Sequence, residues 1–192
     1  MLTEPLAVTL AVTDVLESLG VPYAIGGSLA SAVHGVMRAT MDADVVADLQ
    51  LQHVEPLLRA LSGAFYIDGD MVRDAISRRA SFNVIHLDTM FKVDVFVMRP
   101  RAFDRSQLAR RERILLSESP DQYAYVTTAE DIIVAKLEWY RLGGEVADHQ
   151  WRDVLGVLRV QEDRIDWDYL RRMAASLDVT DLLDRALVEA GR

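Results

Sequence analysis

The feature that most constrains the fold is a short run in the middle of the chain where apolar and polar residues alternate. In residues 91–97, valines occupy positions 93, 95 and 97, while Lys92 and Asp94 stand at alternate positions on the other face. Side chains of a strand alternate between its two faces, so this β-branched run predicts a strand with one buried, apolar face. A carboxylate in the middle of such a strand is costly unless it has a partner or a metal ion.

The same criteria predict further strands and helices along the chain. Strands are expected at residues 21–25, 42–46, 81–87 and 90–98. Helices are expected at residues 6–19, 28–35 and 51–61, and then, with no further strand, at 128–142, 147–160, 166–176 and 178–190. This order favours an α+β fold, with a mixed sheet flanked by helices in residues 1–127 and a helical bundle in residues 128–192.

The composition is that of an acidic globular protein with enough residues for one sizeable core. The 192 residues include no cysteine and carry a formal net charge of −9. No apolar run approaches the roughly 18 residues that a membrane helix needs, and the first 20 residues predict an amphipathic helix, not a signal peptide. We therefore expect a cytoplasmic protein without membrane contact. Basic residues gather between Arg99 and Arg113, which is most typical of a solvated helix face.

A glycine pair joins the first predicted strand to the helix that follows. Gly26 and Gly27 precede Ser28, a suitable N-cap residue. Glycine lets the backbone approach a ligand closely, and a helix start offers unpaired N–H groups with a partial positive charge. These residues predict a phosphate-binding turn, although taken alone they are more typical of a plain strand–turn–helix connection.

Two further carboxylates stand in the next predicted strand. Asp42 and Asp44 are two residues apart, so their side chains share a face and lie about 7 Å apart. Two carboxylates side by side repel each other, and a divalent cation between them makes the arrangement favourable. If the strand with Asp94 lies beside this one, three carboxylates converge near the glycine pair. Oxygen donors alone suit Mg²⁺ or Mn²⁺ and not zinc, so these three acids are the predicted metal ligands.

The order of these motifs resembles the DNA polymerase β-type nucleotidyltransferase superfamily. The resemblance rests on a Gly-Gly-Ser turn before a helix, an Asp-x-Asp strand and a later strand with one Asp, here Gly26, Gly27, Ser28, Asp42, Asp44 and Asp94. Arg38 and Thr40, two and four residues before Asp42, make the chain similar to the minimal nucleotidyltransferases that include the AbiEii-type toxins. The resemblance implies a nucleotidyltransferase fold, catalysis by the three acids with Mg²⁺ or Mn²⁺, and NTP contacts from the glycine turn, Arg38 and Thr40.

The first helix after residue 127 extends the resemblance. Thr127 and Glu130 form a capping-box pattern at its start. Lys136 falls on the apolar stripe of this helix, where a charge needs a partner. By spacing alone, a lysine that reaches solvent from the edge of the core is the more usual explanation. The toxin-like family has a lysine here and an aspartate in a later motif, which match Lys136 and Asp153. The resemblance implies that Lys136 neutralises the leaving pyrophosphate and that Asp153 orients Lys136 or contacts the nucleotide.

The implied reaction transfers a nucleoside monophosphate from an NTP to an acceptor hydroxyl and releases pyrophosphate. The toxin-like branch implies an RNA acceptor such as tRNA, and the RNA backbone would then contact the arginines of residues 99–113. It also implies a cognate antitoxin as partner. Two alternatives stay open. One is a small-molecule, antibiotic-type nucleotidyltransferase, because an acidic surface suits cationic aminoglycosides. The other is a non-catalytic nucleotide-binding or interaction module with the same fold.

Overall fold

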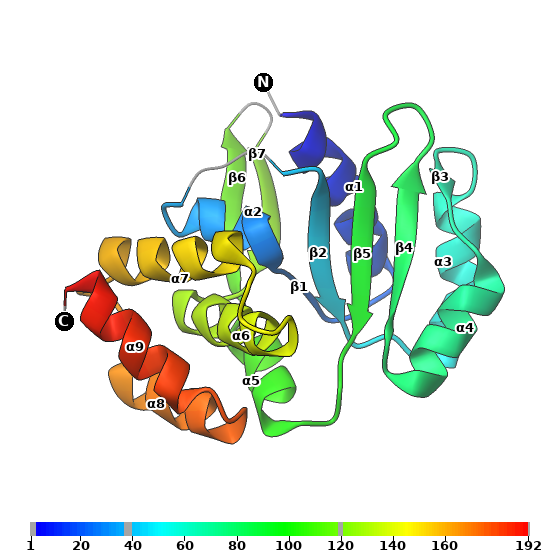
Figure 1. The fold of residues 1–192 in the computed structure, drawn as a ribbon. Coiled ribbons are helices and arrows are strands. Elements are labelled where there is room, and N and C mark those ends of the chain that lie inside the picture. The colour runs from blue at the N-terminus through cyan, green and yellow to red at the C-terminus, as the bar shows by residue number, and fades with distance from the viewer. Residues whose placement is uncertain (1–2, 37–39, 119–120, 192) are drawn as a thin grey trace. The chain divides into compact units, whose positions relative to one another are not determined.

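The computed structural model describes residues 3–36, 40–118 and 121–191. The chain forms two compact units, each built from two stretches of sequence (Figure 1). The first unit takes residues 1–26 and 39–126, and the second takes residues 27–38 and 127–192. The chain therefore changes unit after residues 26, 38 and 126.

In its described residues, the first unit is built on a mixed sheet of seven strands in the order β3-β4-β5-β2-β1-β7-β6. The strands are β1 (Tyr23–Ile25), β2 (Asp42–Ala47), β3 (Phe65–Tyr66), β4 (Ser81–His86), β5 (Lys92–Val97), β6 (Glu112–Glu118) and β7 (Asp121–Val126). Strand β2 is parallel to β5 and antiparallel to β1, and β1 is parallel to β7. This mixed sheet confirms the predicted α+β class.

The two faces of the sheet differ because β2 and β5 alternate strictly between buried and half-buried residues. The apolar members of these strands, such as Val45 and Val93, are fully buried. Helix α1 (Glu4–Ser18) contacts β1, β2 and β5 and lies behind β2 and β5 in Figure 1. The intervening polar residues therefore lie on the opposite face of the sheet.

The remaining elements of the first unit are helical. They are the 3-10 helix η1 (Leu51–His53) and the helices α3 (Val54–Leu61), α4 (Gly69–Arg78) and α5 (Ala102–Arg110). Among them, α4 contacts β4 and α5 contacts β1. The basic cluster thus begins before α5 and ends in β6. The hairpin of β6 and β7 was not predicted, because β6 is an edge strand in which no position is buried and most are exposed, so the alternation that marks a strand is weak there.

The second unit is helical in its described residues, as predicted for the C-terminal part of the chain. It contains α2 (Gly27–Val33), α6 (Ala129–Leu142), α7 (Asp148–Val160), α8 (Trp167–Ser176) and α9 (Thr180–Ala190). Helix α6 is central, because it contacts α2, α7, α8 and α9. No helix in the described part of the chain is long and apolar enough to cross a membrane.

The start of α6 differs by one residue from the predicted capping box. The N-cap is Thr128, whose hydroxyl accepts a hydrogen bond from the Asp131 main-chain N–H. Thr127 is buried, and the Glu130 carboxylate accepts the Asp166 main-chain N–H instead. Two adjacent threonines make the register of a capping box ambiguous in sequence, and the packing of α6 decides between them.

Candidate functional site

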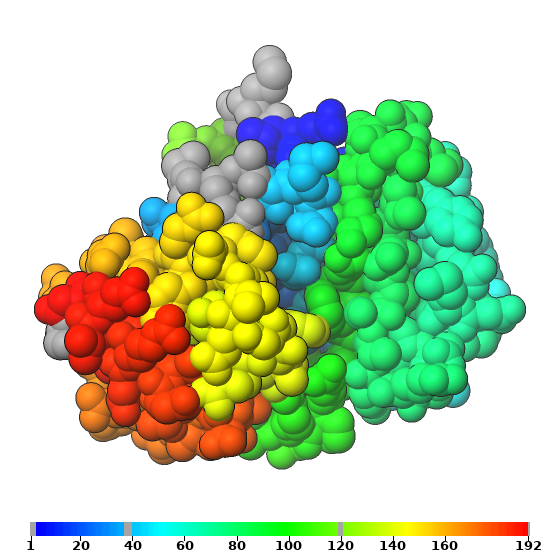
Figure 2. Space-filling model, in the orientation of Figure 1, coloured from blue at the N-terminus to red at the C-terminus, as the bar shows by residue number. Residues whose placement is uncertain are grey.

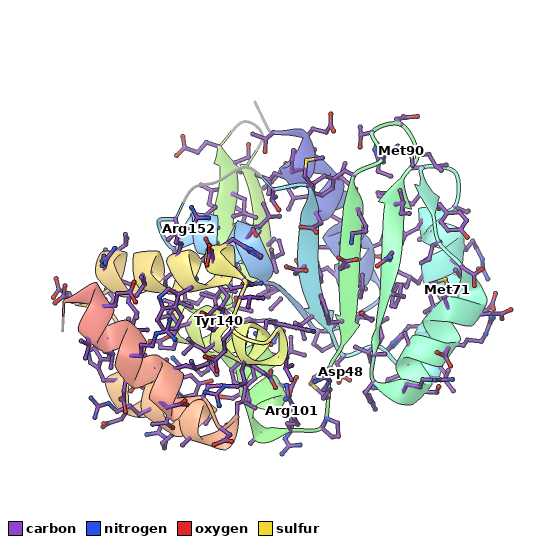
Figure 3. All side chains as sticks on the ribbon, in the orientation of Figure 1. Asp48, Met71, Met90, Arg101, Tyr140 and Arg152 are labelled. Carbon is purple, nitrogen blue, oxygen red and sulfur yellow. The ribbon has the colours of Figure 1, made fainter. Side chains whose placement is uncertain are left out.

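The register of two parallel strands brings the three predicted acids of the first unit together on one face. Asp44 is paired with Asp94, and Asp42 is paired with Lys92. All three aspartates are partly exposed. Strand β5 begins just after the turn at Met90, and Figure 3 labels Met90 and Asp48 at opposite ends of this part of the sheet. In Figure 2 the light-blue region at the start of β2 and the green region of β5 both reach the surface turned toward the viewer.

Asp94 has the partner that a carboxylate in the middle of a strand requires. The Lys92 ammonium lies 2.8 Å from Asp94 Oδ2, and the Asp94 side chain is only 16% exposed. The hydrogen bond to Asp94, with the further negative charges of Asp42 and Asp44, raises the pKa of Lys92 above its ordinary value. Lys92 therefore stays charged at neutral pH, and its charge lies in the field of all three acids.

The donors at this site fit a hard divalent cation by their chemistry, since all three are carboxylates on adjacent strands. They do not converge on one point: among residues 3–36, 40–118 and 121–191, no three His, Cys, Asp or Glu side chains gather closely enough to hold a metal ion. Asp94 instead holds the Lys92 ammonium. The sheet thus aligns the three acids in register, and it pairs one of them with a lysine.

Hydrogen bonds connect strand β2 to Thr40 and to the glycine turn. The Thr40 hydroxyl lies 2.8 Å from the Asp42 carbonyl oxygen and 3.2 Å from Asp42 Oδ1. The Gly26 N–H donates to the Asp44 carbonyl oxygen at 2.8 Å, so the glycine turn starts directly beside the Asp-x-Asp strand. Arg38, the other residue predicted to contact nucleotide, lies outside the described residues.

Gly27, the second glycine of the turn, is the first residue of the second unit. Gly27 has a φ of 53°, in the left-handed region that residues with a Cβ rarely adopt, which explains why glycine stands at this position. Helix α2 begins at Gly27, so Ser28 lies in its first turn and not at the predicted N-cap. Ser28 is buried, and the Ser31 hydroxyl donates to the Gly27 carbonyl oxygen.

Lys136 and Asp153 form a buried ion pair between α6 and α7. Lys136 Nζ lies 2.8 Å from Asp153 Oδ2, and both side chains are at most 4% exposed. The ammonium also donates to Gln150 Oε1 at 3.1 Å. A lysine that reaches solvent is therefore the wrong explanation for this position. The two residues that the resemblance singled out are direct partners within the second unit.

Two residues of these clusters were missed in the sequence, Lys92 and Gln150. The alternation of the strand put Lys92 on the same face as Asp94, but Lys92 was not predicted to belong to the site. Its position two residues before Asp94 was the available signal. Gln150 stands one turn before Asp153 on the same helix, at the i, i+3 spacing that brings side chains together. The sequence shows that Lys92 and Gln150 each lie close to an aspartate, but a spacing of two or three residues does not by itself identify a hydrogen bond.

No protein-family model and no curated protein matches the sequence. Similarity appears in the fold. An antigenic nucleotidyltransferase-like protein from Paracoccidioides brasiliensis has a TM-score of 0.55 and 16% identity, over 96% of this chain and 90% of its own. The antibiotic-resistance factor ANT(2'')-Ia has a TM-score of 0.52 and 15% identity, over 93% of this chain and 95% of its own. The chain therefore has a nucleotidyltransferase-like fold.

Proposed function

We propose that this protein is a metal-dependent nucleotidyltransferase that moves a nucleoside monophosphate from an NTP to an acceptor hydroxyl. The observation that carries the proposal is the register of β2 and β5, which puts Asp42, Asp44 and Asp94 on one face of two adjacent strands. A nucleotidyltransferase-like fold supports it, as does the sequence resemblance. Three acids on one half-buried face repel each other, and a bound divalent cation would offset that repulsion.

In the proposed reaction, the acceptor oxygen forms a bond to the α-phosphorus while the bond from that phosphorus to the pyrophosphate oxygen breaks. Asp42 and Asp44 would hold two metal ions, and Asp94 would complete the ligand shell of the second. Bound Mg²⁺ or Mn²⁺ would offset the charge of the triphosphate and lower the pKa of the attacking hydroxyl. Asp94 takes the proton of that hydroxyl, and pyrophosphate leaves.

The remaining predicted residues keep the roles that the resemblance implies. Gly26, Gly27, Ser28, Arg38 and Thr40 are proposed to bind the nucleotide, and Lys136 to neutralise the leaving pyrophosphate. The buried pair with Asp153 supports a role for Lys136 beyond packing, because a buried ammonium needs a carboxylate to stay charged. We propose Asp153 as the residue that orients Lys136.

The proposed acceptor is an RNA end, such as that of tRNA. The β6–β7 hairpin supports this choice with two arginine–tyrosine stacks: the Arg111 guanidinium lies 4.6 Å from the centre of the Tyr125 ring, and that of Arg113 lies 4.6 Å from the centre of the Tyr123 ring. Register pairs Arg113 with Tyr125, so these side chains share one face. Arginine beside aromatic rings suits phosphates and unstacked bases. A cognate antitoxin partner, which the toxin-like branch implies, stays part of this proposal.

A small-molecule acceptor is the second candidate. The net charge of −9 favours cationic substrates, and one protein of similar fold is an antibiotic-resistance factor. The two candidates differ in one measurable respect: transfer to RNA should weaken steeply as salt rises, whereas transfer to an aminoglycoside involves far fewer charges.

The test is incubation of the protein with each labelled NTP, Mg²⁺, and either total cellular RNA or a panel of aminoglycosides and lincosamides. We expect label in RNA, and a loss of at least about a hundredfold in transfer rate for Asp42→Asn and Asp94→Asn. Asp70→Asn is the matched control, because Asp70 belongs to the same unit and its side chain is 98% exposed. Label on the drugs alone would establish the second candidate. Unchanged transfer by both site variants would contradict the catalytic assignment and favour a non-catalytic module.

A further inference from the structure

The β6–β7 hairpin, at one edge of the sheet (Figure 1), presents two arginine–tyrosine pairs in a row. Register pairs Arg113 with Tyr125 and Leu115 with Tyr123, so these four side chains share one face of the hairpin. Arg111 joins them, because its guanidinium lies over the Tyr125 ring as that of Arg113 lies over the Tyr123 ring. We call these five residues the hairpin face. It carries two positive charges and no carboxylate, in a chain whose net charge is −9.

The inner pair, Arg111 and Tyr125, is fixed by its surroundings. Tyr125 is half-buried, and its ring meets the Tyr23 ring edge-on with 5.7 Å between the ring centres. Arg111 Nη1 donates to the Leu108 carbonyl oxygen near the end of α5. Both contacts exist before any ligand arrives, so binding at this guanidinium loses little conformational entropy.

The outer pair, Arg113 and Tyr123, reaches solvent. The Tyr123 side chain is 40% exposed, its neighbour Leu115 is 39% exposed, and Arg113 is exposed as well. Stacking on the tyrosine covers one side of the Arg113 guanidinium and leaves the other side as a flat surface for a nucleobase. The N–H donors of a guanidinium lie in its plane, so they point past the stacked base toward a phosphate.

We propose that the hairpin face binds about two unpaired nucleotides of a single-stranded RNA end, with the bases stacked at the outer pair and the phosphates at the two guanidinium groups. Positions 111 and 113 are about 7 Å apart along the strand, which suits neighbouring phosphates of an extended chain. The inference rests on the proposed function for the choice of RNA, but binding to this face can be measured without transfer.

Two features favour a single strand over a duplex. Stacking at the outer pair needs a base with an accessible face, which a base inside a duplex does not offer. The hairpin also ends in two acids, because Glu118 is paired with Asp121 beside its turn. These carboxylates repel a phosphate backbone that continues along the strands, so only a short stretch of nucleotides fits.

The test measures the fluorescence anisotropy of a short labelled single-stranded RNA with the full chain, without NTP or metal. We expect Arg113→Ala and Tyr123→Ala each to weaken binding by about tenfold, and Tyr123→Phe to bind as the wild type does. Arg113→Ala should also lower the slope of log affinity against log salt by about one, whereas Arg113→Lys keeps that slope and loses the stacking affinity. Tyr66→Ala is the matched control, because Tyr66 is 55% exposed on β3 at the opposite edge of the sheet.

A duplex of the same sequence should bind more weakly, and equal affinity for both would overturn the inference. So would affinities of Arg113→Ala and Tyr123→Ala within twofold of the wild type, or a wild type that does not bind the single strand at low salt. In each of these cases, label transferred to RNA would leave the proposed function intact. If the hairpin variants lose RNA binding but no NTP labels RNA, the hairpin face stands and the transfer reaction is the part that is wrong.

Discussion

At the scale of single residues, one pair of opposite charges lies where water barely reaches. In the second unit, Lys136 and Asp153 are almost fully buried and in contact. Such a pair contributes little net stability compared with apolar residues of the same volume, but removal of one member takes the opposite charge away from the other, which stays buried. The two effects can be separated by mutation.

We expect Lys136→Met to lower the free energy of unfolding by about 3–5 kcal/mol, because Asp153 is left buried without its cation. Adding Asp153→Leu should restore much of the loss, since the double variant contains neither of these two buried charges. Urea unfolding followed by circular dichroism measures both. A double variant no more stable than Lys136→Met would show that the pair itself, and not the stranded charge, accounts for the loss.

In the first unit, the buried tyrosine Tyr23 makes the stability of the fold sensitive to alkaline pH. Tyr23 is 1% exposed, its hydroxyl donates to Glu17 Oε2 at 3.2 Å, and burial raises its pKa to about 12. The unfolded chain releases this proton near the ordinary pKa of about 10. The stability that neutral Tyr23 contributes is therefore complete below about pH 10 and is lost as the pH rises toward 12.

Replacement of Tyr23 by phenylalanine should remove this part of the pH dependence. Between pH 10 and 12, the unfolding free energy of Tyr23→Phe should fall less steeply than that of the wild type, as measured by chemical unfolding at fixed pH. Tyr66→Phe is the control, because Tyr66 is 55% exposed. Equal slopes for wild type and Tyr23→Phe would contradict the prediction.

At the scale of elements, close approach explains a glycine in the interior of helix α7. A Cβ added at Gly156 would lie 2.6 Å from Val36 Cγ2, in the segment that follows α2. Both residues belong to the second unit, where α2 contacts α7. Gly156 thus allows the early segment to pack against a helix that lies more than a hundred residues further along the chain.

Gly156→Ala should therefore destabilise the protein by about 1–3 kcal/mol through overpacking, although alanine normally stabilises a helix interior by about 1 kcal/mol relative to glycine. Val36→Ala removes the obstructing methyl groups, so Gly156→Ala should cost much less in that background. Thermal unfolding of the wild type, the two single variants and the double variant gives the coupling energy between positions 36 and 156. Additive effects would show that the contact between positions 36 and 156 is not the cause.

At the scale of the whole molecule, the helical unit is not continuous in sequence. Residues 27–38 belong to it, together with residues 127–192. Helix α2 buries Ala30 and Ser31 and contacts α6 and α7. A chain that ends at Val126 keeps α2 but loses both helices that it packs against.

We expect a chain of residues 1–126 to expose this apolar surface, to bind the dye ANS and to aggregate more readily than the full chain. Co-expression with residues 127–192 should restore a soluble, ANS-negative protein, because the two pieces together contain all of α2, α6 and α7. A soluble, monomeric 1–126 chain with no ANS binding would show that α2 needs no partner from the later helices.

The sequence by itself determined which side chains share a face of each element. The alternation in β5 placed Asp94 and Lys92 opposite the valines, and the helical stripe of α6 placed Lys136 among apolar residues, as the structure shows. These are local properties, because the strand and helix periods depend only on backbone geometry. The same local signals predicted the mixed sheet and the four C-terminal helices.

Tertiary structure alone decided which of these faces meet. It set β2 beside β5, directed Asp94 to Lys92 instead of to the other two acids, and paired Lys136 with Asp153. It also formed the β6–β7 hairpin at a sheet edge, where the exposure of β6 leaves little periodic signal. Some of these contacts join residues that are far apart in sequence, and in others one residue could have contacted a different partner. Which contact forms therefore depends on packing over the whole unit and not on any local pattern.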